Sequence, residues 1–201
     1  MHVSPRFVSL FVLLTAMGTL AVPPTSAQIV VSSPVPASAQ SLSTWYAHHV
    51  PVRFRATSRL AVRELSEADM NTYLHGGAED RSQSPADDMG DIDGVYESHP
   101  DRMTLRLAGE HGIDMFTFAH EYGHYVWFSL FSDDDRRRYE ALYKRRRAAG
   151  HLVTRYAETG VEEGFAEAFS FYVAQPPILA ARDPASFQFL SQWGLRPRAS
   201  L

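Results

Sequence analysis

The sequence of 201 residues predicts an α+β fold in which a small sheet or hairpin precedes a helix-rich part. Strand-like segments are confined to the first half of the chain, whereas capping residues and helix stops follow one another in the second half. The composition, with 45% hydrophobic and 21% charged residues, is that of an ordinary globular protein. A single domain with a short N-terminal extension is therefore expected.

The N-terminus has the pattern of a secretory signal peptide, predicted over residues 1–27. Arg6 precedes an apolar run from Phe7 to Val22, and small residues up to Ala27 offer a cleavage site. The run is shorter than the roughly 20 residues of a membrane span, which favours cleavage over the alternative of an uncleaved anchor. We expect a secreted, extracellular or periplasmic protein without stable membrane insertion. The sequence leaves its oligomeric state open.

Residues 28–50 are expected to form a leader followed by a possible first helix. Residues 28–40 are rich in Ser, Pro and Ala, as flexible linkers are. Ser41 or Ser43 could cap the helix that follows. The main domain is predicted over residues 51–201.

The next elements alternate between strand, helix and loop. Leu60–Leu65 alternates as a half-buried strand does. Ser66 with Asp69 is a weak capping box, and Gly76-Gly77 is a usual helix stop. Residues 78–93 are acidic and rich in turn residues, which predicts an exposed loop. The carboxylates of this loop lack the spacing of a calcium-binding loop.

A β-hairpin is predicted directly after this loop. Its strands are Gly94–Glu97 and Met103–Leu107, and Ser98–Arg102 connects them. The second strand alternates, so one of its faces should carry Met103, Leu105 and Leu107.

Helices are predicted for the rest of the chain from capping residues and from glycine or proline stops. They run from Asp114 to about Phe131, from Ser132 to Ala149, from Val161 to Ala174, and from Pro184 to Gly194.

The charge balance argues against nucleic acid as a partner. The formal net charge is −4, and nucleic-acid binding usually needs a strongly basic face. The basic run Lys144–Arg147 ends a predicted helix that begins with Asp133–Asp135, and this order of charges complements the dipole of a surface helix. The chain has no cysteine. Any metal must therefore be bound by histidine and carboxylate side chains.

A metal site is predicted by the sequence His120-Glu121-Tyr122-Gly123-His124, which has the H-E-x-x-H pattern. Side chains four residues apart lie on one face of a helix, so both imidazoles can bind one zinc ion. Glu121 would lie beside that ion, where it can take a proton from the attacking water and deliver it to the leaving amine. One zinc ion per chain is expected.

The third ligand is predicted on a later helix. A histidine six residues after His124 would indicate a metzincin, but Leu130 occupies that position. Glu163 and Glu167 stand four apart in an otherwise apolar segment. We predict that Glu163 binds the zinc and that Glu167 accepts the second ring N–H of a ligand histidine. A solvated acidic face is the alternative interpretation of this pair.

The chain as a whole resembles the catalytic domain of anthrax lethal factor and its relatives, which include bacterial Pro-Pro endopeptidases. The resemblance rests on HEYGH followed by Tyr156, Glu163 and Glu167 at the family's spacing, and it spans roughly residues 55–193. Two further segments resemble the family, FAEAF (Phe165–Phe169) and FQFL (Phe187–Leu190). The strand pair before HEYGH does so as well. A zincin-like fold and a zinc endopeptidase of the gluzincin type are implied. The resemblance does not extend to the carrier-binding and kinase-docking domains of lethal factor, so the functions of those domains are not expected here.

The resemblance also implies roles for a tyrosine and a strand. Tyr156 would donate a hydrogen bond to the oxyanion of the tetrahedral intermediate, although its residue type alone would suggest core packing. An extended protein or peptide substrate would pair with an edge strand formed by Met103, Thr104, Leu105, Arg106 and Leu107.

The expected function is hydrolysis of peptide bonds in extended protein segments. A catalytically inactive binding module with the same fold is the main alternative, against which the intact Glu121 argues. A zinc hydrolase acting on a non-peptide bond is a third possibility. The sequence does not indicate the substrate or the residues that flank the cleaved bond.

Overall fold

A computed structural model describes residues 29–76, 92–108 and 112–193. These residues form a mixed α+β fold with a small sheet, as the sequence predicts. The strands are β1 (Ile29–Ser32), β2 (Leu60–Leu65), β3 (Gly94–Ser98) and β4 (Asp101–Arg106). The helices are α1 (Pro36–His49), α2 (Glu67–Gly76), α3 (Met115–Tyr125), α4 (Asp133–Ala148), α5 (Val161–Ala174), α6 (Pro176–Arg182) and α7 (Pro184–Gln192). A π-helix, Val126–Leu130, continues α3, and the single turn Tyr156–Glu158 precedes α5.

The sheet has the strand order β1-β2-β4-β3. β1 and β4 both pair parallel with β2, and β3 pairs antiparallel with β4. The expectation that residues Met103–Leu107 form an edge strand is therefore wrong. β2 occupies the side of β4 that an incoming peptide would need, and β3 occupies the other side. The edge strand next to β4 is β3.

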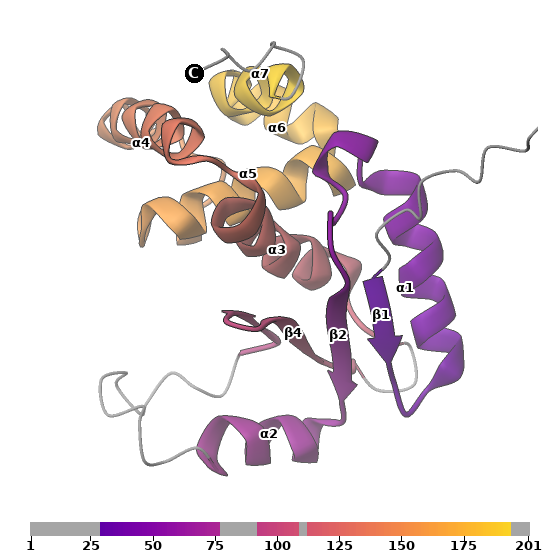
Figure 1. Ribbon diagram of the computed structural model, residues 1–201. Coiled ribbons are helices and arrows are strands. Elements are labelled where there is room, and N and C mark those ends of the chain that lie inside the picture. Colours follow the sequence, from indigo (N-terminus) through magenta and orange to yellow (C-terminus); the bar gives the residue numbers. More distant parts are fainter. Residues whose placement is uncertain (1–28, 77–91, 109–111, 194–201) are drawn as a thin grey trace, which may run out of the picture.

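The helices are arranged in layers around this sheet (Figure 1). α3 lies against β3 and β4, and α5 crosses α3 on the side away from the sheet. α4, α6 and α7 lie further out, α1 runs beside β1, and α2 lies at the other end of the molecule. The H-E-x-x-H motif is thus carried by the helix between the sheet and the outer helices. No helix in the described residues is long and apolar enough to cross a membrane.

The core forms where α3 meets the sheet and α5. The face of β4 predicted to be apolar is buried, and so are the aromatic rings on α3 and α5 that flank the motif. These residues are Met103, Leu105, Leu107, Phe118, Tyr122, Tyr125, Phe165 and Phe169.

The predicted caps of α2, α3 and α4 are confirmed, whereas the cap predicted at Ser41 or Ser43 is wrong because α1 begins at Pro36 and both serines lie inside it. The Asp114 side chain accepts hydrogen bonds from the backbone at the start of α3. Ser132 and Asp135 form the predicted capping box of α4. The Ser66 hydroxyl accepts the Asp69 N–H at 3.2 Å at the start of α2. At the end of α4, Gly150 has φ +68°, the left-handed conformation that glycine adopts without strain.

Other local predictions are wrong or lie outside the described residues. The expected flexible leader instead forms strand β1 and the first turn of α1, where Pro36 provides the fixed φ suited to a first helical position. Pro176 does not only end α5 but also begins α6, a helix that is not among the predicted ones. The predicted signal peptide and residues 77–91 of the acidic loop are outside the described residues.

α3 and α5 approach each other unusually closely at one glycine. A Cβ atom added at Gly123 would lie 2.7 Å from the Ala166 Cα atom and 3.2 Å from its Cβ atom. Real Cβ atoms essentially never come within 3.0 Å of another heavy atom, and here the neighbour is backbone that cannot rotate away. The H-E-x-x-H helix can therefore pack on α5 only because its fourth motif position is glycine.

We predict that Gly123→Ala destabilises the protein by about 3 kcal/mol, because overpacking a rigid contact costs about 1–3 kcal/mol. Gly160→Ala is the matched control, since its added Cβ would be no closer than 3.6 Å to another atom. Denaturant unfolding of both variants measures the difference. If Gly123→Ala were as stable as Gly160→Ala, the close helix contact would not exist.

Candidate metal centre

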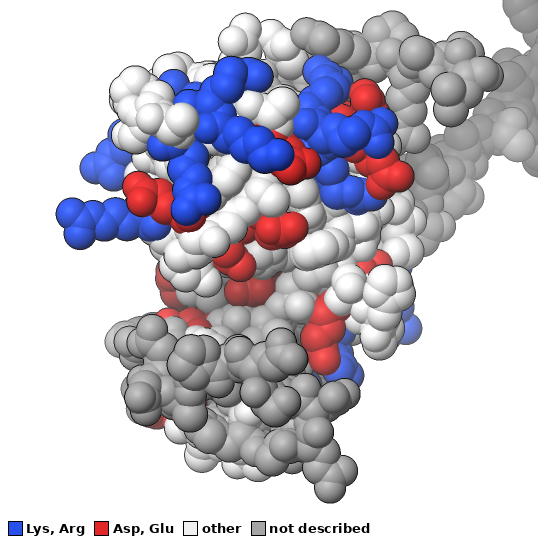
Figure 2. Space-filling model, turned by 90° about the vertical axis from the view of Figure 1, so that its left-hand side faces the viewer, with Lys and Arg blue, Asp and Glu red and all other residues white. Residues whose placement is uncertain are grey.

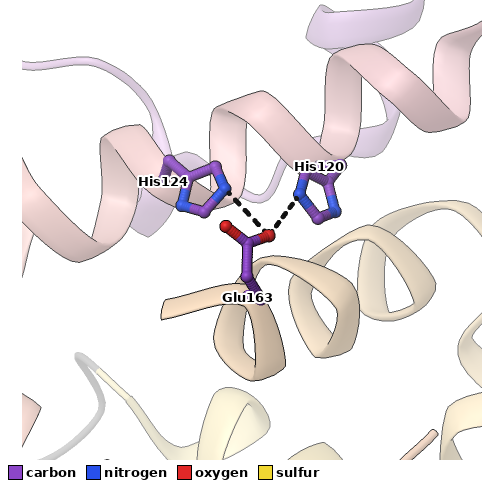
Figure 3. A group of neighbouring side chains, drawn as sticks. All are labelled: His120, His124 and Glu163. Carbon is purple, nitrogen blue, oxygen red and sulfur yellow. Dashed lines mark hydrogen bonds and ion pairs between the residues drawn. The ribbon is translucent and has the colours of Figure 1, made fainter. Parts of the chain in front are cut away.

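Three side chains that could hold a metal ion meet between α3 and α5 (Figure 3). His120 and His124 point from α3 toward Glu163 on the first turn of α5. Glu163 Oε2 lies 3.1 Å from His120 Nε2 and 3.4 Å from His124 Nε2. Ligand atoms of a tetrahedral zinc ion are about 3.4 Å apart, given metal–nitrogen distances of about 2.0–2.1 Å. The three groups could therefore hold a metal ion, and their ligand atoms all lie within 4.8 Å of one another.

The charges of this group favour a cation. Burial lowers the pKa of His120, but hydrogen bonds to Glu163 and Glu167 outweigh this effect and raise the pKa to about 9. Burial opposes ionisation of Glu163, yet hydrogen bonds from His120 and His124 hold the pKa of its carboxyl well below the usual range. A protonated imidazole thus neutralises the ionised carboxylate. A divalent metal ion could replace that proton.

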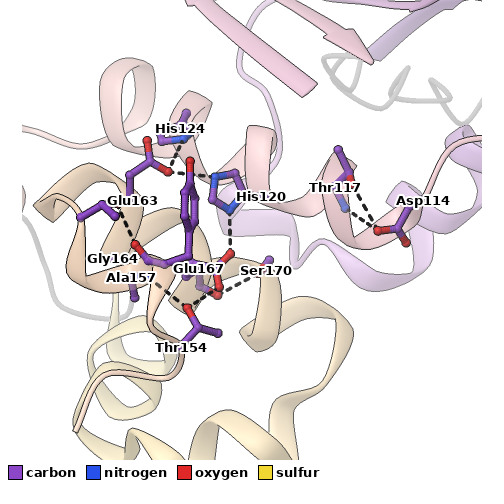
Figure 4. A network of polar contacts seen from close by, with 12 residues as sticks. Asp114, Thr117, His120, His124, Thr154, Ala157, Glu163, Gly164, Glu167 and Ser170 are labelled. Carbon is purple, nitrogen blue, oxygen red and sulfur yellow. Dashed lines mark hydrogen bonds and ion pairs between the residues drawn. The ribbon is translucent and has the colours of Figure 1, made fainter. Parts of the chain in front are cut away.

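Glu167 lies one turn further along α5, behind His120 (Figure 4). His120 Nδ1–H donates to Glu167 Oε1 at 2.9 Å. The Glu167 side chain is buried, with 7% of the residue exposed. A carboxylate in this position fixes the orientation of the imidazole ring and leaves Nε2 directed at the metal site.

Thr154, which is not among the residues predicted from the sequence, extends this arrangement. Its hydroxyl donates to Glu167 Oε2 at 2.6 Å and accepts the Ala157 N–H at 3.1 Å. The hydroxyl therefore connects the Glu167 carboxylate to the turn that carries Tyr156. No local pattern marks such a residue, because a threonine between two helices is ordinary. A weak signal is its position two residues before Tyr156.

Glu121 lies beside the two histidines and against strand β3. It is 8% exposed, and its carboxylate accepts a hydrogen bond from the Tyr96 backbone N–H. Burial raises the pKa of the Glu121 carboxyl, and the charges of His124 and His120 oppose the rise. A Cβ atom at Gly94 would lie 2.6 Å from Glu121 Cγ. The absence of a side chain at Gly94 is what lets Glu121 rest on the strand.

Tyr156 lies on the accessible side of the site. Its side chain is 55% exposed, and its ring centroid lies 5.7 Å from that of His120. Burial of the hydroxyl and the nearby Glu163 carboxylate, with which it forms a hydrogen bond, raise the pKa of Tyr156 to about 12. The hydroxyl therefore remains a hydrogen-bond donor at neutral pH.

The basic residues of α4 do not belong to this site. Figure 2 shows Lys and Arg side chains over the helical part of one face, above a hollow lined by acidic side chains. Lys144 pairs with Glu140, four residues away, at 2.7 Å, and Arg137 pairs with Asp134 at 3.5 Å. These are pairs within a solvated helix, which contribute little to binding or stability.

Comparisons with known proteins show a fold similarity to an enzyme. No protein-family model and no curated protein sequence matches the chain. Among solved structures, the PRO-PRO endopeptidase PPEP-2 from Paenibacillus alvei is similar, with a TM-score of 0.52 and 13% sequence identity. The similarity covers 82% of this chain and 96% of the other. It extends over nearly the entire enzyme and shows a distant similarity of fold.

We predict that Thr154→Val, which keeps the shape but removes the hydroxyl, weakens binding of Zn²⁺ about 10-fold. Partners of metal-bound histidines typically contribute 10–100-fold, and Thr154 acts through such a partner. Thr154→Ser keeps the hydroxyl and should bind Zn²⁺ as the wild type does. Competition with a chromophoric chelator measures both affinities. Equal affinity of the valine and serine variants would rule out this role.

Proposed function

We propose that the protein is a secreted, zinc-dependent endopeptidase that cleaves extended protein or peptide segments. The observation that carries the proposal is the convergence of His120, His124 and Glu163 with a buried carboxylate, Glu121, beside them. The fold similarity to an endopeptidase and the spacing of Tyr156, Glu163 and Glu167 support it. The same residues support a distant relationship to lethal-factor-like enzymes of the gluzincin type.

The metal in this proposal is one zinc ion per chain, held by His120, His124 and Glu163. Two imidazoles and a carboxylate without thiolates are a usual ligand set of catalytic zinc. Bound there, zinc would polarise the scissile carbonyl and lower the pKa of the attacking water. Glu167 and Thr154 keep the His120 ring oriented for this role.

Glu121 is the proposed general base. It accepts the proton of the attacking water and passes it to the departing amine. Its burial supports this role. Burial raises the pKa of the Glu121 carboxyl toward neutral pH, and a general base works best when its pKa lies near the working pH. The Tyr96 N–H holds the carboxylate at the edge of the sheet, where a substrate would lie.

Tyr156 is the proposed donor to the oxyanion. Its pKa is raised to about 12, so the phenol keeps its proton and can donate to the negative oxygen of the tetrahedral intermediate. Its exposure and its position beside His120 leave it accessible to a substrate.

The outer edge of β3, on which the described residues place no further strand, is the proposed substrate track. The Arg106 N–H donates to the Asp93 carbonyl at 2.7 Å, so odd-numbered residues of β3 direct their backbone groups toward β4. The backbone groups of Gly94, Tyr96 and Ser98 therefore face away from the sheet. The Tyr96 N–H is used by Glu121, and an extended peptide can pair with the remaining outward groups of this edge, directly beside Glu121.

We predict that Glu121→Gln keeps about one zinc ion per chain but loses peptidase activity by about 10²–10⁴-fold, the usual contribution of general acid–base catalysis. Metal analysis and cleavage of a diverse peptide library, with and without a chelator, measure both properties. Full activity in this variant would refute the mechanism. A zinc-loaded wild type that cleaves no peptide would favour the binding module.

We predict that Gly94→Ala lowers kcat by about 10²-fold without loss of zinc, because a displacement of about 1 Å in a reacting group can cost that much. The new methyl group would force Glu121 off the strand. Val95→Ala is the matched control, since its side chain lies on the other face of β3. Steady-state kinetics on one cleaved peptide test the pair. Similar kcat values for both variants would show that Glu121 does not depend on this contact.

A further inference from the structure

An exposed aromatic ring lies next to the metal site and is not explained by the proposed mechanism. Phe128 is 48% exposed and belongs to the π-helix that continues α3. Short π-helical segments are rare and often occur at functional sites. The ring stacks on His124 with a centroid distance of 6.4 Å, and on Tyr96 of β3 with a distance of 6.1 Å. We call Phe128 together with the Tyr96 ring the aromatic shelf.

The aromatic shelf is held in place by a polar cluster. The Tyr96 hydroxyl donates to the Asp101 carboxylate and lies 2.9 Å from Ser129 Oγ. The Ser129 hydroxyl donates to the same Asp101 oxygen at 2.7 Å. The residue that follows Phe128 is thereby tied to both strands of the hairpin. The exposed ring has a defined position, as a binding surface requires.

The direction of β3 indicates which part of a peptide would meet the shelf. The strand runs from Gly94, beside Glu121, toward Ser98. Antiparallel pairing is the more stable arrangement per residue, so a bound peptide would run in the opposite direction. Its residues before the cleaved bond would then lie toward Ser98 and over Phe128. The residues after that bond would continue past Gly94.

We propose that the aromatic shelf binds an apolar side chain, aromatic or large aliphatic, on the N-terminal side of the cleaved bond. The inference rests on the proposed peptidase function and deepens it by naming a substrate class. Aromatic faces stack with other rings and bury aliphatic groups. In an enclosed apolar pocket a single methylene group changes the preference about 10–200-fold, and an exposed ring is expected to act at the lower end of this range. A peptide with a charged residue at this position should therefore be cleaved about 10-fold less efficiently.

The test is a cleavage-site profile of the full chain on a peptide library with every residue type at each position. The wild type should prefer apolar residues before the cleaved bond, and Phe128→Ser should reduce that preference about 10-fold in kcat/KM. Phe128→Leu should keep the preference for aliphatic residues and lose the one for aromatic residues. Ile178→Ser is the matched control, because Ile178 is an exposed apolar residue on α6, and it should leave the profile unchanged.

The possible outcomes separate this inference from the function on which it rests. If both Phe128 variants cleaved peptides with the profile of the wild type, the proposed role of the aromatic shelf would be refuted, whereas the proposed peptidase function would stand. A change confined to residues after the cleaved bond would overturn it as well. If the zinc-loaded wild type cleaved no peptide, both the proposed peptidase function and the substrate preference inferred for the aromatic shelf would be refuted. Binding of a preferred peptide to Glu121→Gln, and about 10-fold weaker binding when Phe128→Ser is added, is the expected result without turnover.

Discussion

The close approach of α3 and α5 at Gly123 and Ala166 is the constraint on which the rest of the structure depends. At this separation the imidazoles on α3 and the carboxylate on α5 meet without long side chains spanning a gap. The other side of α5 is fixed in a similar way, because the Tyr143 ring packs where Gly164 has no side chain. Two glycines therefore set the position of α5, and each is next to a residue that could bind the metal.

The polar groups of the site are organised around this helix pair, but they connect it to neighbouring elements. Thr154 connects Glu167 on α5 to the Tyr156 turn. Glu121 connects α3 to the backbone of β3. Burying three carboxylates and two imidazoles, fully or in part, is favourable only when each has partners, and here every one of them does. The site is therefore preorganised by the same contacts that make its burial possible.

Local signals were sufficient for much of the fold and for the central residues. The caps at Asp114 and Ser132 and the spacing of the motif depend only on nearby residues, so the sequence reveals them. Strand order is different, because it depends on which distant segments pair. The structure places β4 inside the sheet, and the burial of Met103, Thr104 and Leu105 on both of its faces is typical of such an interior strand. Thr154 and Gly94 gain their importance from contacts across the fold, which no local pattern contains.

The central claim is that His120, His124 and Glu163 bind one zinc ion at the α3–α5 contact. Anomalous diffraction on both sides of the zinc absorption edge, from crystals of the zinc-loaded protein, tests this most directly. We expect one anomalous peak per chain, within bonding distance of both imidazole Nε2 atoms and of the Glu163 carboxylate. A peak bound elsewhere, or no peak between these three residues, would contradict the account.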